Sequence, residues 1–76
     1  MIARELPVSD IRARPDARPL NEAAVAGLVD SIAAVGIINP LRVRGVEGDW
    51  DLIAGQHRHE AATRLGLVNV PCLIVH

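Results

Sequence analysis

One apolar stripe constrains the fold of this chain more than any other feature of its sequence. Between residues 22 and 35, apolar side chains recur at steps of three and four residues, the spacing of one helix face: Val25, Leu28, Val29, Ile32 and Val35. Asn21 is a good N-cap before the stripe, and Gly36 is a good helix end after it. A chain of 76 residues has room for one modest core. We therefore predict a helix whose apolar face packs on the remainder of one small domain.

The remainder of the sequence predicts strands and a second helix. Alternating or continuous apolar runs indicate strands at residues 5–11, 40–44, 50–54 and 70–75. A polar turn at 45–49 joins the middle two as an antiparallel hairpin, and two prolines make 12–19 a loop. The second helix runs from after Gly55 to Leu65. We predict an α+β fold in the order β-α-β-β-α-β, with two helices packed on a small mixed sheet.

Charge and composition narrow the classes of function. The formal net charge is −1, so this segment alone is expected to bind duplex DNA weakly, because DNA binding needs clustered basic residues. Cys72 is the single cysteine, which excludes an intrachain disulfide, and its apolar strand favours a buried thiol over a reactive one. No long apolar run indicates a signal peptide or a membrane span, so we expect a cytoplasmic protein.

The small size of the chain predicts that it pairs with a second copy or belongs to a longer protein. Half of the residues are hydrophobic, but they are almost all aliphatic, and Trp50 is the single aromatic residue, which we interpret as a packing residue. Such a thin core is marginal alone, so a homodimer is expected. The sequence stops at His76 directly after a predicted strand. We expect residues 1–76 to be one domain, the front part of a longer protein.

The turn between the hairpin and the second helix is the candidate site. It reads Gly55-Gln56-His57-Arg58. Free backbone amides and the positive end of the helix dipole attract anions at a helix start, and glycine allows close approach of a ligand. Arg58 adds a fork of donors suited to phosphate. The pattern predicts a phosphate or nucleotide site.

The position of Arg58 sharpens this prediction. It shares a helix face with Ala61, Ala62 and Leu65, so it should be half-buried. A buried guanidinium needs a negative partner. That partner is either a carboxylate, such as Asp16 or Asp51, or the phosphate of a ligand. Because neighbouring helix positions face different ways, His57 and His59 are not expected to share a metal. His57, in the first turn, is the better anion contact, and His59 is expected to be solvated.

Two longer stretches carry a resemblance to a known family. Residues 31–43 and 52–62 resemble the first and second conserved boxes of ParB-type partition proteins, in the same order. Residues 67–72 resemble the segment after the second box, and Arg18 matches an arginine that precedes the first helix. The chain is thus similar, over nearly its whole length, to the ParB/sulfiredoxin superfamily.

The resemblance implies a nucleotide ligand at the Gly-x-x-Arg turn: CTP in partition proteins or ATP in sulfiredoxins, with magnesium. It places the phosphates or nucleotide at Gly55, Gln56, His57, Arg58, Ala61, Arg18, Asn39 and Pro40. Sulfiredoxin chemistry is excluded, because Gln56 stands where the catalytic cysteine would be. Partition proteins usually have Glu at position 56 and Arg at position 60. Gln56 and Glu60 here predict slow or absent hydrolysis.

Three functions follow from these patterns. The first is a nucleotide-binding regulatory module of a partition or transcription-control protein, with DNA read by regions outside this chain. The second is a nuclease or ATPase, which would need carboxylates converging on the turn, and Glu60, Asp49 and Asp51 show no such arrangement in sequence. The third is a structural interaction domain, in which Arg58 is simply ion-paired. We favour the first.

Overall fold

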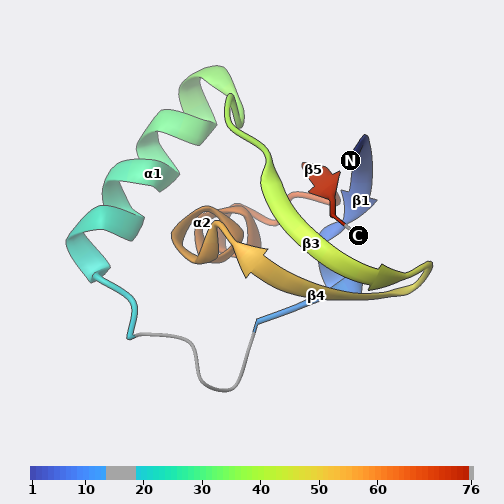
Figure 1. Cartoon of the computed structure of the whole chain (residues 1–76). Coiled ribbons are helices and arrows are strands. Elements are labelled where there is room, and N and C mark those ends of the chain that lie inside the picture. Colours follow the sequence, from blue (N-terminus) through green and yellow to red (C-terminus); the bar gives the residue numbers. More distant parts are fainter. Residues whose placement is uncertain (14–18, 76) are drawn as a thin grey trace.

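Residues 1–13 and 19–75, which the computed structural model describes, form five strands and two α-helices (Figure 1). The elements in chain order are β1 (Ile2–Pro7), a short 3-10 helix η1 (Val8–Asp10), β2 (Ile11–Arg12), α1 (Glu22–Val35), β3 (Leu41–Val46), β4 (Asp49–Ala54), α2 (Gln56–Leu65) and β5 (Asn69–Ile74). The predicted α+β class and the predicted helices are confirmed.

The strands form one curled mixed sheet in the order β1-β5-β3-β4-β2. β3 and β4 form the predicted antiparallel hairpin, with Val43 opposite Leu52. β5 lies antiparallel to β1 and parallel to β3. The first strand differs from the prediction. The segment predicted as one strand over 5–11 is divided by η1, so that β1 and β2 lie at opposite edges of the sheet.

The two helices form successive layers. Figure 1 shows α2 between α1 and the sheet. Alternate strand residues, among them Leu6, Leu41, Val43 and Val70, face the inside of the curl and are buried. The stripe of α1 packs mainly on α2, where Val25 and Ile32 meet Ala61. The prediction that both helices pack on the sheet therefore holds directly for α2, whereas α1 rests on α2.

The exposed fractions of Trp50 and Val35 test two predictions about which side chains are buried. Trp50 is a packing residue as predicted, with 4% of its surface exposed. Val35, the last residue of the α1 stripe, is 66% exposed and does not take part in the packing of α1 on α2. Neither described helix is long and apolar enough to span a lipid bilayer.

Cys72 provides a pH-dependent test of this core. Its side chain is buried on β5, and burial, with a smaller contribution from the charge of Glu5, raises the pKa of the thiol to about 11. The unfolded thiol ionises first, so the stability contribution of the neutral thiol is lost as the pH rises above its ordinary pKa toward 11. The sequence contains no lysine or tyrosine, so Cys72 dominates side-chain titration in this range.

We predict that the free energy of unfolding falls by about 2 kcal/mol between about pH 8 and pH 11. Urea unfolding under reducing conditions measures it. Cys72→Ala, whose own cost is independent of pH, should remove most of this fall. An equal fall in both proteins would show that the thiol is not the group responsible.

Candidate functional site

Gly55 joins β4 to α2 and sets the geometry of the turn. Its φ is +101°, a left-handed conformation that favours glycine. A Cβ atom at this position would lie 2.6 Å from Cδ2 of Leu41 and 3.4 Å from its Cα, so a side chain here would also force the buried Leu41 side chain to move. No side chain in the described part of the chain caps the start of α2, and its first turn contains no acidic residue. The turn therefore presents the positive end of α2 without a negative group from its own sequence.

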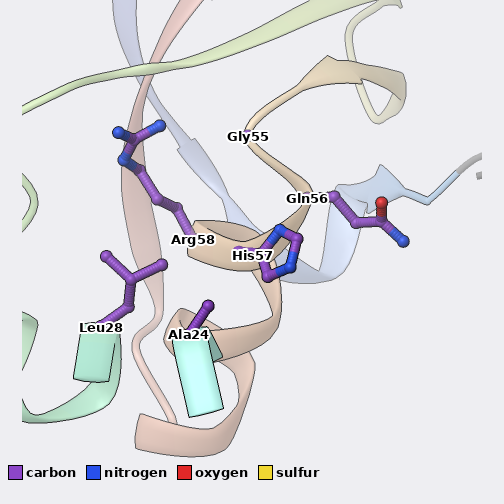
Figure 2. Close-up of a pocket in the computed structure, with 6 residues that line it drawn as sticks. All are labelled: Ala24, Leu28, Gly55, Gln56, His57 and Arg58. Carbon is purple, nitrogen blue, oxygen red and sulfur yellow. The ribbon is translucent and has the colours of Figure 1, made fainter. Parts of the chain in front are cut away.

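A hollow of about 380 Å³ opens beside this turn, between α1 and the start of α2 (Figure 2). Residues 55–58 form one side, and Ala24 and Leu28 of α1 form the other. A smaller hollow of about 110 Å³ adjoins it and shares Leu28 and Arg58. Its other lining residues come from α1 and the loop that leads to β3: Ser31, Ile32, Gly36, Ile37, Ile38 and Asn39.

Arg58 lies where the two hollows meet. Its side chain is half-buried, as predicted, and it has no hydrogen bond or ion pair with any described residue. Asp51, one of the two carboxylates considered as a structural partner, pairs instead with Arg12 at 3.6 Å. Asp16, the other, lies outside the described residues. Arg58 thus contributes a positive charge to the hollows that the described carboxylates do not neutralise.

Glu60, the acid that the sequence places next to the turn, is held elsewhere. Its Oε2 accepts a hydrogen bond of 2.9 Å from Nε of Arg64. The same guanidinium binds both carboxylate oxygens of Glu22 on α1, at 2.9 and 2.7 Å. This hydrogen bonding, followed by the positive charge of Arg64, lowers the pKa of Glu22. Arg64 therefore ties the start of α1 to α2 and neutralises part of the charge of Glu60.

His57 makes a second tie between the helices. Its Nε2 accepts a hydrogen bond of 3.1 Å from the backbone N–H of Asn21, the N-cap of α1. Nε2 must be unprotonated to accept, so Nδ1 carries the ring proton. His59 differs from the expectation of a solvated ring, because its Nε2 is buried and has no hydrogen-bond partner among the described residues. The described residues contain no cluster of three or more His, Cys, Asp or Glu side chains suited to a metal ion.

The structure brings some of the predicted site residues together and separates others. Gly55, Gln56, His57 and Arg58 line the larger hollow, although Figure 2 shows the Gln56 side chain pointing away from Arg58. Asn39 lines the smaller hollow. Ala61 is fully buried between the helices, and Pro40 lines a separate depression beside β1 and β5. Arg18 lies outside the described residues.

Sequence reasoning missed the α1 wall of the site. Ala24 and Leu28, one helical turn apart, face the start of α2 across the hollow. Their spacing of four residues places them on one helix face, but Leu28 was interpreted only as part of the packing stripe and Ala24 was not singled out. The hydrogen bond between Asn21 and His57 joins residues 36 positions apart and has no periodic signal in the sequence.

Comparison with known sequences gives consistent matches. The model of the ParB N-terminal domain matches residues 1–76. The probable chromosome 2-partitioning protein ParB of Deinococcus radiodurans is 34% identical over 73 residues, which cover 93% of this chain and 25% of that protein. The chain spans about a quarter of the length of the relatives of this kind that it matches.

Solved structures match the fold closely. The structure of the chromosome-partitioning protein ParB from Caulobacter crescentus complexed with CTP-gamma-S has a TM-score of 0.89 and 31% identity, covering 100% of this chain and 45% of that one. Sulfiredoxin from Arabidopsis thaliana has a TM-score of 0.85 and 35% identity, covering 99% of this chain and 85% of that one. The predicted resemblance to the ParB/sulfiredoxin superfamily is confirmed.

The close approach of Gly55 to Leu41 predicts opposite effects of the same substitution at two glycines. Gly55→Ala combines a positive φ with a steric clash and should lower the free energy of unfolding by about 2 kcal/mol. Gly27 lies inside α1, where an added Cβ atom would meet nothing within 4 Å. Gly27→Ala should therefore raise the stability by up to about 1 kcal/mol. Urea denaturation measures both changes, and similar effects of the two substitutions would contradict this account of the turn.

Proposed function

The chain belongs to the ParB N-terminal domain family, and on that premise we propose that it is a nucleotide-binding regulatory module of a partition or transcription-control protein. The proposed ligand is a nucleoside triphosphate, CTP or ATP, taken with or without magnesium. Its phosphates would bind at the start of α2, against the turn of residues 55–58. Ligand binding, rather than turnover, is the activity that we propose for this chain.

One observation carries this proposal. Arg58 is half-buried at an uncapped helix start and has no carboxylate partner among the described residues. Removing a guanidinium from water is costly unless a negative group replaces the lost hydration. A phosphate satisfies the guanidinium with paired hydrogen bonds and also binds the backbone amides of the turn. This arrangement favours an anion ligand over the third hypothesis, in which Arg58 is ion-paired within the protein.

The smaller hollow supports a nucleotide over a simple phosphate ion. It adjoins the larger hollow at Arg58 and Leu28, and apolar side chains such as Ile37 and Ile38 line it beside the amide of Asn39. A flat, partly apolar base packs well on aliphatic side chains, and an amide can both donate to and accept from its polar edge. We propose that the sugar and base extend from Arg58 toward this loop.

The related proteins support a nucleotide ligand, and they also show that this chain corresponds to only part of a partition protein. A structural relative binds CTP-gamma-S, and the sequence relatives are chromosome-partitioning proteins. This chain corresponds to about a quarter of such a protein. We propose that specific DNA recognition depends on regions outside this chain, and that the chain itself pairs as a homodimer. A nuclease is less well supported, because the carboxylates of Asp49 and Asp51 both face Arg12 and not the turn.

We predict that Arg58→Ala weakens nucleotide binding by about 10- to 100-fold, because one charge-assisted pair of hydrogen bonds is lost. Calorimetric titration of the chain with CTP, ATP, GTP and UTP, with and without magnesium, measures the affinities. The affinity of Arg58→Lys should lie between those of the wild type and Arg58→Ala, because lysine keeps the positive charge but cannot make the paired hydrogen bonds.

Arg42→Ala is the matched control. Arg42 is an exposed arginine on β3 that lines neither hollow, so its removal changes the net charge equally and should leave the affinity nearly unchanged. If Arg42→Ala and Arg58→Ala lose affinity equally, the loss reflects the net charge of the protein and not a phosphate site at Arg58. Unchanged binding in Arg58→Ala would refute the proposed phosphate site.

A further inference from the structure

His57 is held by a backbone group and not by a charge. Its Nε2 accepts the N–H of Asn21 at 3.1 Å, and the ring stands at the edge of the larger hollow (Figure 2). The unprotonated Nε2 fixes the tautomer with the proton on Nδ1. The N–H of an N-cap residue has no partner within its own helix, so the imidazole supplies an acceptor that α1 itself does not provide.

Two hydrogen bonds in succession connect His57 to the α1 wall of the hollow, and Asn21 takes part in both. Oδ1 of Asn21 accepts a hydrogen bond of 3.0 Å from the backbone N–H of Ala24. Ala24, with Leu28 one turn later, forms the α1 side of the hollow. His57 lies on the opposite side, in the phosphate turn. A single side chain of the turn thus fixes the first turn of the facing helix.

The charged residues near His57 on both helices determine what happens when the His57 contact is lost. Arg58, His59 and Glu60 follow it on α2, and Glu22 follows Asn21 on α1. Arg64 binds the carboxylates of both Glu60 and Glu22. Because Glu22 remains tied to Arg64, loss of the His57 contact should displace the start of α1 without detaching the helix.

We propose that His57, in its neutral form, is a positioning residue that sets the distance between the phosphate turn and the α1 wall. This role rests on the proposed function, because it concerns the affinity of the same hollow. It differs from a direct ligand contact in one respect: what matters is an acceptor at the place of Nε2, not a positive charge. Glutamine offers such an acceptor on a side chain of similar reach, whereas alanine offers none.

The first test uses the protein without ligand. The amide of Asn21 is followed by NMR in the wild type, His57→Gln and His57→Ala under the same conditions. The amide should be hydrogen-bonded in the wild type and should lose that bond in His57→Ala, which has no acceptor at this place. In His57→Gln the amide should stay hydrogen-bonded. An Asn21 amide that is the same in the wild type and His57→Ala, or one that is lost equally in His57→Gln, would overturn the proposal.

The second test measures the affinity for CTP. His57→Ala should bind about five-fold more weakly, the loss expected for one hydrogen bond to a helix end. His57→Gln should recover most of that loss. His59→Gln, a change of the neighbouring histidine that does not line the hollow, is the control and should bind like the wild type.

The two tests separate failure of this inference from failure of the proposed function. If the wild-type protein binds none of the nucleotides, the proposed function fails and the positioning role fails with it. If the wild type binds CTP and His57→Ala binds it equally well, the positioning role alone is overturned. If His57→Gln is as weak as His57→Ala, an acceptor is not what the site requires, and the proposal is again refuted.

Discussion

The larger hollow exists because α1 is packed on α2. Val25 and Ile32 of α1 meet Ala61 of α2, and these side chains are almost completely buried. The small side chain of Ala61 allows the two helices to approach closely. Since α1 makes its main contacts with α2, this packing brings Ala24 and Leu28 to face the turn of residues 55–58, and the distance between them is then adjusted, in our proposal, by the contact of His57 with Asn21. The resemblance implied that Ala61 lies at the phosphates, and its position suggests a structural contribution to the same site.

The charges of the site are arranged around this contact in two groups. Arg64 takes up the carboxylates of Glu22 and Glu60 at one end of the helix pair. Arg58 stands at the hollows without a carboxylate partner among the described residues. Glu60, which stands where partition proteins usually have Arg, therefore has its charge offset by Arg64 and not by Arg58. The start of α2 keeps its attraction for anions as a result.

Patterns that repeat along the chain were predicted well, and isolated contacts were not. The stripe of α1 and the alternation of the hairpin each involve several residues, and single residues at the helix ends, such as the Asn21 cap and Gly55, mark where the helices begin, so the two helices and the hairpin followed from sequence. β2 has two residues, too few to show an alternation, and it was merged with β1. The half-buried position of Arg58 followed from its helix face. The hydrogen bond of His57 to Asn21 depends on how α1 docks, which no local pattern records.

The central claim is that a nucleotide binds between the start of α2 and α1, and one measurement tests it directly. Amide resonances of the chain are recorded by NMR during titration with CTP and magnesium. The account predicts that the largest shifts fall on residues 55–58, with smaller ones at Ala24, Leu28 and Asn39, and none at the separate depression around Ala3 and Cys72. Shifts concentrated at that depression, or no shifts at saturating CTP, would contradict it.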